Sequence, residues 1–441
     1  MNKNLTIGNQ KIASLFDSGT FVEIGAYIKR CGSQDTYDGI ICGYGSISGK
    51  LAYAFVQDSD RLKGAFDSTG AKKIGMLYDM AIKNGAPVIG VFDSAGAVVF
   101  DGSAALSAYG SFLSNVARAS GIVPQIAVIN GVCTGLSLTA SAMFDFTVTV
   151  EGKSQMYLTP SANKDGKKVP DPAIKAQDEA SAFSYARKLA EILPLNNNDS
   201  ASIEITDSMN RVSSPEGLTG RALVESLCDN GDFTVLYGES GKELVCGFAF
   251  FGGELAGVVA SDYAENKGKL TCKGAKKAAS FISFCDRFGI SVLTFVDTEG
   301  FSENICASSA AELTTAYANS DCAKVTVVTG KAYGAGFTLL GSKSIGADLE
   351  IALPGAVISV MPPESAVAFI MNDEISPEKS RADVEREWNE KYASAVLAAE
   401  KGDIDDIVAP EELRARICAA LCMLASKADT YPERKHFRMP L

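Results

Sequence analysis

The chain has 441 residues, of which 46% are hydrophobic and 21% charged, and these proportions are ordinary for a globular protein with room for two domains of about 200 residues. Its net charge of −12 argues against nucleic acid or an anionic membrane as a general partner, because both attract clustered Lys and Arg. The N-terminal residues lack a charged segment followed by an apolar one, and no run of about 18 apolar residues occurs, so we expect a cytoplasmic protein.

The first third of the chain reads as strands and helices in alternation. After a short helix, the runs Ile40–Tyr44 and Leu51–Val56 predict two strands separated by glycine-containing turns. From Gly70 the apolar period becomes helical, and Asn84–Gly85 ends that helix. The face predicted to be buried holds Ile74, Leu77, Tyr78 and Ala81.

Pro87 opens the next strand, PVIGVFD, and the loop DSAGA follows at its carboxyl end, where α/β folds bind ligands. A helix over Ala104–Ala119 leads to the strand IAVIN. We expect this helix to bury Leu106, Tyr109, Leu113 and Val116. Strands and helices joined by short loops predict βαβ units and an α/β fold.

The middle of the chain is polar. Residues 153–177 lose the apolar period and predict a mobile surface segment, which a helix over Ala180–Leu193 follows. The stretch from NNNDSAS to SSPEG predicts a linker, and similar elements start again near Leu218. The chain ends in a charged helix (Ala382–Lys401), a second helix (Glu411–Lys427) and the basic tail PERKHFRMPL, which we expect to pack on the body or on a neighbour.

The two halves of the sequence resemble each other. Gly39–Asp58 aligns with Glu243–Asp262, and Thr69–Gly96 aligns with Lys273–Gly300, both at an interval of 204 residues. Further out the interval changes slightly, so that LFDSGTF (15–21) aligns with LCDNGDF (227–233). A register held over this length predicts two copies of one domain, residues 1–210 and 211–441.

Each half contains a strand that runs through glycines into a helix-compatible segment. These segments are Ile126–Phe146 and, after the strand Val325–Thr329, Lys331–Asp348. Such a turn leaves N–H groups of the first helical turn unpaired, and they can hold an oxyanion or a phosphate. Close packing of the helix on the sheet explains either segment alone, but two of them in equivalent places favour a binding role.

Cysteine and histidine usage narrows the chemistry. The eleven cysteines form no CxxC pair, and most lie in apolar runs (Cys42, Cys246, Cys285, Cys418 and Cys422), so we expect reduced, buried thiols. The one histidine, His436, lies near the C-terminal end. It argues against a Ser-His-Asp mechanism, unless the tail supplies the base, and against a histidine-rich metal site, so we predict no metal.

Ordered motifs run along nearly the whole chain: LFDSGTFVEI, GAPVIGVFDSAGA, GIVPQIAVINGVCTG, KAYGAGFTLLGSKSIGADLEIALPGAVISVMPPESAV, AAEKGDIDDIVAPEELRARICAAL and PERKHFRMPL. With them the sequence resembles the carboxyltransferase subunit of biotin-dependent acyl-CoA carboxylases, of the propionyl-CoA carboxylase beta-chain type, and the allied decarboxylases. The resemblance implies tandem crotonase-like (ClpP/crotonase) ββα-superhelix domains, usually in hexamers whose active site lies between the N-domain of one subunit and the C-domain of another.

The resemblance also implies the reaction and its partners. A carboxyl group moves between biotin and an acyl-CoA, and the biotin comes on a separate carrier protein because this chain has no biotin attachment motif. The implied partners are a biotin carboxyl carrier protein, a biotin carboxylase or a membrane decarboxylase subunit, and further copies of the chain in a hexamer or dimer. Neither nucleic acid nor a metal is expected.

Carboxyl transfer needs negative charge held on two oxygens, those of the thioester enolate and of the biotin carbonyl, and backbone N–H pairs can do this. By resemblance these pairs are Gly135 with Leu136 in the N-domain and Ala335 with Gly336 in the C-domain. The N-domain would bind acyl-CoA and the C-domain biotin. Further binding residues are the loop Ser94, Ala95 and Gly96, the phosphate-binding candidates Lys72 and Lys73, and Tyr333 with Gly334; a solvated helix start explains the two lysines equally well.

The sequence departs from the family pattern at these sites. Gly135–Leu136 replaces paired glycines, which requires a negative φ at Leu136. The loop SGGAR has become Ser94–Val98 without its arginine, and Glu299–Gly300 replaces a proline-glycine pair. After Tyr157 an acidic, glycine-rich segment is shortened to the lysine-rich ANKDGKKVPDP.

Two alternatives therefore stay open. A catalytically degenerate paralogue acting as a scaffold in a biotin-dependent complex would also show altered loops on a retained core. A crotonase-like hydrolase or isomerase acting on a CoA ester would need a carboxylate base such as Asp101, Glu299 or Glu364, for which the sequence offers no convincing partner.

Overall fold

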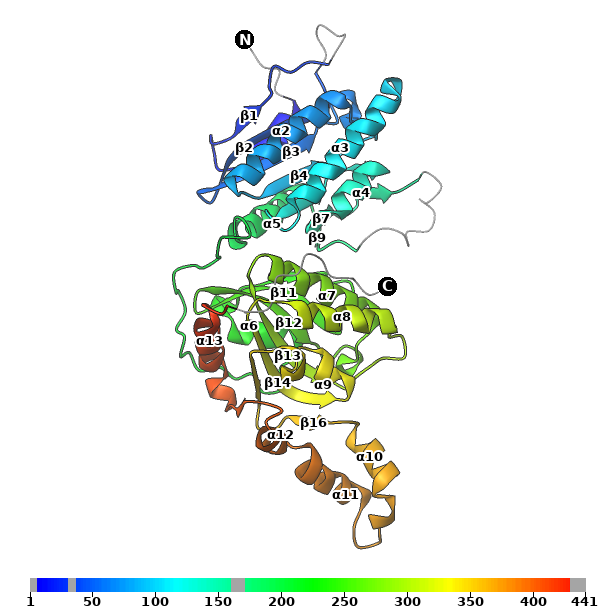
Figure 1. Ribbon diagram of the computed structural model, residues 1–441, viewed down its shortest axis with the longest axis vertical. Coiled ribbons are helices and arrows are strands. Elements are labelled where there is room, and N and C mark those ends of the chain that lie inside the picture. Colours follow the sequence, from blue (N-terminus) through cyan, green and yellow to red (C-terminus); the bar gives the residue numbers. More distant parts are fainter. Residues whose placement is uncertain (1–5, 31–36, 160–170, 429–441) are drawn as a thin grey trace. The chain divides into compact units, whose positions relative to one another are not determined.

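The computed structural model describes residues 6–30, 37–159 and 171–428, and it divides into two compact units, Met1–Ala201 (unit 1) and Ser202–Leu441 (unit 2) (Figure 1). The division falls inside the predicted linker, slightly before residue 210. The tail after residue 428, with His436, and most of the ANKDGKKVPDP segment lie outside the described residues.

Unit 1 is built on a seven-stranded sheet within the described residues, in the order β1-β2-β3-β4-β5-β7-β9. Its strands are β1 (Val22–Ile24), β2 (Ile40–Ile47), β3 (Lys50–Gln57), β4 (Val88–Phe92), β5 (Gln125–Ile129), β7 (Phe146–Val150) and β9 (Ile174–Ala176). The first three are antiparallel and the others parallel, and a small parallel pair, β6 (Val132–Thr134) and β8 (Gln155–Tyr157), extends beyond the sheet.

Unit 2 repeats this arrangement in the order β10-β11-β12-β13-β14-β15-β17. Its strands are β10 (Phe233–Leu236), β11 (Leu244–Phe251), β12 (Glu254–Ser261), β13 (Ser291–Thr298), β14 (Lys324–Tyr333), β15 (Leu349–Ala352) and β17 (Asp406–Ile407). The end of β14 pairs with β16 (Val357–Ser359), as β6 pairs with β8 in unit 1. Strand order and direction thus follow the repeat seen in the sequence, and the predicted α/β class is confirmed.

Helices cover the sheets (Figure 1). In unit 1 they are α1 (Ile7–Ser14), α2 (Ser68–Asn84), α3 (Ser103–Ala119), α4 (Leu136–Ala142) and α5 (Glu179–Ile192). In unit 2 they are α6 (Gly220–Leu227), α7 (Cys272–Arg287), α8 (Ala307–Asn319), α9 (Ala335–Leu339), α10 (Pro363–Ile370), α11 (Arg381–Trp388), α12 (Ala395–Lys401) and α13 (Leu413–Leu424).

Helix α2 shows how the sequence sets an element. The Asp67 carboxylate accepts the N–H groups of Thr69 and Gly70, and Gly85 ends the helix in the left-handed conformation. The four residues predicted for its inner face, Ile74, Leu77, Tyr78 and Ala81, are all buried. They pack with Phe55, Phe92 and Phe112, whose rings meet near edge-on at 5.6 Å around Phe55.

Three predicted segments differ in the structure. On α3, Leu106 is 60% exposed rather than buried, and Phe112 takes the core position. The predicted helix Ala382–Lys401 is interrupted: α11 ends at Trp388, a π turn over Asn389–Ala393 follows, and Ser394 caps α12 anew by accepting the N–H of Leu397. The polar stretch predicted over residues 153–177 contributes β8 and β9 at its two ends.

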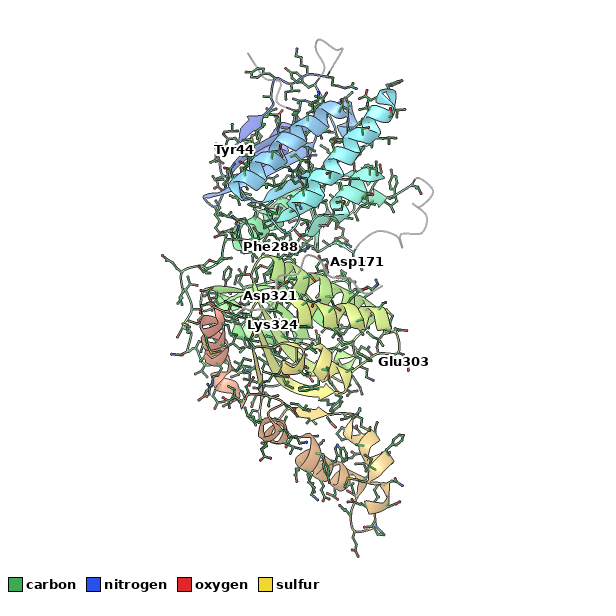
Figure 2. All side chains as sticks on the ribbon, in the orientation of Figure 1. Tyr44, Asp171, Phe288, Glu303, Asp321 and Lys324 are labelled. Carbon is green, nitrogen blue, oxygen red and sulfur yellow. A yellow bond between two sulfur atoms is a disulfide. The ribbon has the colours of Figure 1, made fainter. Side chains whose placement is uncertain are left out.

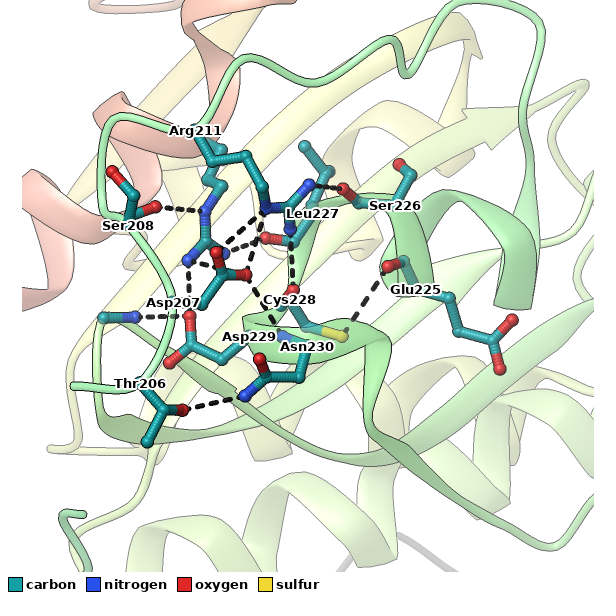
Figure 3. A network of polar contacts seen from close by, with 12 residues as sticks. Thr206, Asp207, Ser208, Arg211, Glu225, Ser226, Leu227, Cys228, Asp229 and Asn230 are labelled. Carbon is teal, nitrogen blue, oxygen red and sulfur yellow. Dashed lines mark hydrogen bonds and ion pairs between the residues drawn. The ribbon is translucent and has the colours of Figure 1, made fainter. Parts of the chain in front are cut away.

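An arginine fixes a matching corner in each unit, partly exposed in unit 1 and buried in unit 2. In unit 1, Arg187 donates to the Leu15 carbonyl and to Asp17, both at 2.8 Å. In unit 2, Arg414 donates to the Leu227 carbonyl and, at 2.5 Å, to Asp229. Figure 3 shows this second network, in which Arg211 also binds Asp207.

The two aspartates of these corners belong to the matched motifs LFDSGTF and LCDNGDF. Each carboxylate also accepts the backbone N–H groups of a hairpin turn, Ser48 and Gly49 in unit 1 and Gly252 and Gly253 in unit 2. The arginines therefore hold the final helix of each unit against its antiparallel hairpin.

The burial and the redox state of the cysteines agree only in part with the prediction. Cys42, Cys246, Cys285 and Cys418 are buried as predicted, whereas Cys422 is exposed. Cys272 and Cys306, whose Cα atoms lie 5.5 Å apart, are joined by a disulfide, so the prediction that all thiols are reduced is wrong for this pair. Cys31 lies outside the described residues.

Figure 2 shows the side chains that these sheets carry, with Tyr44 on β2 and Phe288 at the end of α7 among those labelled. Tyr44 packs on Tyr53 and Phe288 on Phe284, with ring centres 6.0 and 4.8 Å apart. No helix in the described ranges combines the length and hydropathy needed to span a membrane.

Candidate functional site

The two glycine turns have the same backbone conformation. Gly135 lies between β6 and α4 with φ 54° and ψ −123°, and Gly334 lies between β14 and α9 with φ 54° and ψ −127°. This combination is open to glycine and strongly disfavoured for residues with a side chain. The glycines thus set the direction in which each short helix leaves its strand.

The amide of each turn glycine is already bonded. Gly135 donates to the Tyr157 carbonyl at 3.1 Å, and Gly334 donates to the Ser359 carbonyl at 2.8 Å. The prediction that the Gly135 N–H is an oxyanion donor is therefore wrong in this structure, and Gly334 likewise cannot offer its amide to a ligand.

The next two amides in each unit are the candidates. Leu136 and Ser137 open α4, while Ala335 and Gly336 open α9, and first-turn N–H groups have no partner within their helix. Leu136 is not among the residues with positive φ, so the condition placed on it is met. Ser137 was missed from the sequence, although aligning GVCTG with GKAYG pairs it with Gly336.

Position 336 leaves no room for a side chain. A Cβ on it would lie 2.5 Å from the Thr298 methyl group and 3.2 Å from Gly300 Cα. Helix α9 therefore packs closely on the loop that follows β13, so the amides of Ala335 and Gly336 are held at the carboxyl end of that strand.

The three backbone amides of the loop Ser94–Gly96 all donate hydrogen bonds to other groups of the protein. Ser94 donates to the Val132 carbonyl at 2.7 Å, Ala95 to the Lys63 carbonyl at 3.0 Å, and Gly96 to the Ser94 hydroxyl at 3.0 Å. These bonds fix the loop, and because Ser94 is buried, Ala95 is the residue of the loop that lines the cavity where a ligand could bind.

A cavity of about 620 Å³ opens beside this loop and the first glycine turn. It is lined by Ser59, Lys63, Asp93, Ala95, Val132, Thr134, Gly135, Tyr157 and Leu158. The structure thus brings together Ala95 and Gly135, which the sequence singled out, with polar residues that it did not. Parallel strands end here, as expected for a ligand site in an α/β fold.

Asp93 is the carboxylate among the lining residues, and it is tied to the backbone. It accepts the Val132 N–H at 3.3 Å and lies 3.8 Å from the Lys11 ammonium. A Cβ at Gly131 would approach it to 2.2 Å, which explains a glycine there. The Lys63 ammonium is the cation that the lining offers to an anionic ligand.

The two lysines proposed for phosphate lie differently. Lys72 is exposed on α2. Lys73 is 1% exposed, and its ammonium binds Asp38 at 3.1 Å and the Ile40 carbonyl, so its predicted contact with a phosphate is a misassignment. Burial raises the Asp38 pKa, and the Lys73 charge partly offsets that rise.

The loop after β13 carries charged side chains. Tyr263 donates to Glu299 at 2.7 Å, and Lys331 reaches the Tyr263 hydroxyl at 2.6 Å and Glu299 at 3.1 Å. Tyr333, a predicted binding residue, is buried, and burial raises its pKa to about 12. It packs as a neutral phenol beneath the turn.

The carboxylates considered as general bases are engaged or remote. Asp101 pairs with Arg30 at 3.0 Å, Glu299 belongs to the cluster with Lys331, and Glu364 is exposed in the first turn of α10. Within the described residues, no group of three or more His, Cys, Asp and Glu side chains is placed to hold a metal ion.

The sequence matches the family described as carboxyl transferase domain over residues 3–164 and 172–439. It is 32% identical to the propionyl-CoA carboxylase beta chain of Roseobacter denitrificans, covering 98% of this chain and 93% of that protein. It is 33% identical to the methylmalonyl-CoA decarboxylase subunit alpha of Propionigenium modestum, covering 98% and 92%.

A solved structure of similar shape is that of transcarboxylase 12S, described as a hexamer assembly with hydrolysed methylmalonyl-coenzyme A bound. It matches with a TM-score of 0.91 and 29% identity over 98% of this chain and 92% of that one.

Proposed function

Because this chain belongs to the carboxyl transferase domain family, we propose that it moves a carboxyl group between biotin on a separate carrier protein and an acyl-CoA bound in unit 1. Membership confirms the predicted resemblance, the crotonase-like fold and the assignment as a biotin-dependent carboxyltransferase. The bound groups and the division of labour between the units are the proposal.

The observation that carries the proposal is the pair of equivalent glycine turns, each followed by two amides at the start of a short helix. In the transfer the acyl α-carbon loses a proton and gains CO₂, while the biotin nitrogen loses CO₂ and gains a proton. Negative charge develops on the thioester oxygen in one half and on the ureido oxygen in the other. Two sets of fixed N–H donors match this demand.

In unit 1, the cavity lined by Gly135, the residue before Leu136, is large enough for the reactive end of a thioester. Their amides would face the thioester oxygen, and the Lys63 ammonium at the cavity would attract the carboxylated product. In unit 2, Ala335 and Gly336 would face the ureido oxygen. No histidine, nucleophile or metal in this chain has a step in this scheme.

The partners follow from the chemistry. Biotin must reach the site on a carrier protein, so a biotin carboxyl carrier protein and either a biotin carboxylase or a membrane decarboxylase subunit complete the system. Relatives are named as chains of such multisubunit enzymes, and one is a hexamer. We therefore propose a homo-oligomer.

The test is CO₂ release from malonyl-CoA and methylmalonyl-CoA by the full-length protein, with and without free biotin. We expect release that depends on biotin. Acyl-CoA hydrolysis without biotin would favour the hydrolase alternative, and the absence of both turnover and acyl-CoA binding would favour the scaffold.

A further inference from the structure

The residues that line the unit 1 cavity have counterparts in unit 2, set by the repeat and by equivalent strand pairing. In order from unit 1 to unit 2, the correspondences are Ser59 and Tyr263, Lys63 and Lys267, Asp93 and Asp297, Ala95 and Glu299, Val132 and Lys331, Thr134 and Tyr333, Gly135 and Gly334, Tyr157 and Ser359, and Leu158 and Val360. Even the unusual turn is kept, since Lys63 has φ 52° and Lys267 has φ 55°.

Five of these positions differ sharply in size: four side chains are larger in unit 2, Tyr333 in place of Thr134 among them, and one, Ser359 in place of Tyr157, is smaller. The other three larger side chains form one group. Unit 1 has the short side chains of Ser59, Ala95 and Val132 around an open cavity. Unit 2 has tyrosine, glutamate and lysine in the same places. The two units therefore present the same backbone frame with different space inside it.

The three large side chains of unit 2 are bonded to one another. Tyr263 donates to Glu299 at 2.7 Å, and Lys331 reaches both of them, at 2.6 and 3.1 Å. The Lys331 ammonium also lies 4.8 Å from the centre of the Tyr263 ring. Each group restrains the other two, and together they stand at the positions where unit 1 has three short side chains. The cavity of about 510 Å³ in unit 2 that Tyr263 and Asp297 line is not lined by its glycine turn.

We propose that Tyr263, Glu299 and Lys331, named here the unit 2 plug, are specificity-determining residues that exclude acyl-CoA from the second glycine turn. The inference rests on the proposed function, in which unit 1 binds acyl-CoA. Without the plug, the two turns offer the same amide donors in the same frame, and a thioester could enter either one. With it, the second turn is left to a ligand that does not need this space, which suits a compact ureido ring.

Charge keeps the plug in place. Although burial opposes the shift, the hydrogen bonds from Tyr263 and Lys331 hold the Glu299 pKa below its usual range. Burial alone would lower the pKa of Lys331. The hydrogen bonds to Tyr263 and Glu299 outweigh this effect and hold the Lys331 pKa above its usual value. Lys267 adds a further contact with Glu299 at 3.3 Å. A thioester entering here would have to break several charged hydrogen bonds.

The experiment counts propionyl-CoA molecules bound per chain by isothermal titration of the full-length protein. An opened variant carries the unit 1 residues in unit 2: Tyr263→Ser, Glu299→Ala and Lys331→Val. A filled variant carries the plug in unit 1: Ser59→Tyr, Ala95→Glu and Val132→Lys. Leu106→Ala is the matched control, because Leu106 is exposed on α3 and is not among the residues that line the cavity. Circular dichroism verifies that each variant is folded.

We expect one site in the wild type and in the control, two in the opened variant and none in the filled variant. Combining the opened and filled sets should restore one site, now in unit 2. A folded opened variant that still binds one molecule would overturn the plug, as would a folded filled variant that binds normally. If the opened variant does not fold, the filled variant decides alone. A wild type that binds none would instead contradict the proposed function, and the plug with it.

Discussion

At the scale of single residues, the sequence shows charged side chains but not their partners. Asp17 and Asp229 lie in visibly matched motifs, yet the arginines that hold them come from helices far along the chain. Their spacing in the sequence could not pair them, because α5 and α13 lie far along the chain from the aspartates that they meet. The same holds for Lys73, whose partner Asp38 faces it from outside its helix.

Arg414 is 0% exposed and bridges Asp229 and the Leu227 carbonyl, so its removal leaves the buried Asp229 carboxylate without its bound cation. We expect Arg414→Ala to lower the free energy of unfolding of unit 2 by about 3–5 kcal/mol. Urea unfolding of the two units, followed by circular dichroism, measures this loss. The matched change Arg187→Ala should cost less, because Arg187 and Asp17 are partly exposed; an equal loss would contradict this account.

The ionisation of Glu350 makes the free energy of unfolding depend on pH. Burial raises its pKa to about 8, against the opposing hydrogen bond from the Lys343 N–H. Between the ordinary carboxyl pKa and about 8, the folded state holds a proton that the unfolded state has lost, so stability falls as pH rises. The slope from this group is at most about 1.4 kcal/mol per pH unit.

Glu350→Gln should therefore flatten the decline in unfolding free energy between pH 5 and 8, roughly the window set by these pKa values. Urea titrations of both proteins across that range measure it. Parallel curves for the two proteins would show that Glu350 is ionised in the folded state.

At the scale of elements, local signals predicted what local physics controls. The buried face of α2 and its end at Gly85 were predicted correctly, because the apolar period and the terminating glycine belong to the helix itself. On α3, Tyr109 and Val116 are buried as predicted, whereas Leu106 is exposed and Phe112 is buried instead. The prediction of one long helix over residues 382–401 was wrong, because Ser394 caps a new helix although the apolar period continues through it.

The glycine turns were visible as candidate sites, but the donor assignment was one residue early in unit 1. Whether the Gly135 amide is free depends on β8, which supplies the Tyr157 carbonyl from a polar stretch that carried no strand signal. The plug was equally hidden, since its residues lie far apart in the sequence and meet only in the folded unit.

Gly135→Ala tests the turn as an element. A Cβ there meets no atom closer than 3.8 Å, so the cost is the strain of φ 54° with ψ −123° alone. We expect a loss of about 1–3 kcal/mol in unfolding free energy, measured by urea titration. Gly110→Ala is the control, since Gly110 lies in α3 with open space around it, and should stabilise by about 0.5–1 kcal/mol. Equal effects of the two changes would be inconsistent with a strained turn.

At the scale of the whole molecule, a duplicated fold has become asymmetric. Each unit has its own sheet and its own buried cluster, so each holds the apolar contacts that a domain needs. The repeat and the family could be recognised from sequence because glycines, strand cores and corner motifs are fixed by the fold. What distinguishes the two sites lies in side chains that the repeat does not constrain.

We therefore expect the fragments 1–201 and 202–441 to fold separately, each with a cooperative thermal transition. Circular dichroism of the two purified fragments measures this. A fragment that is unfolded when alone, yet folds when its counterpart is added, would show that the core is shared.

The central claim is that amides after each glycine turn stabilise the charge of one half-reaction, and Leu136 allows its most direct test. Proline is tolerated at the first helical position, so Leu136→Pro removes one N–H with little other change, and Leu136→Ala retains it. We expect the biotin-dependent kcat of the proline variant to fall by about 10²–10³, the usual effect of one lost donor, while the alanine variant stays near wild type. Equal activity of the two variants would contradict the claim.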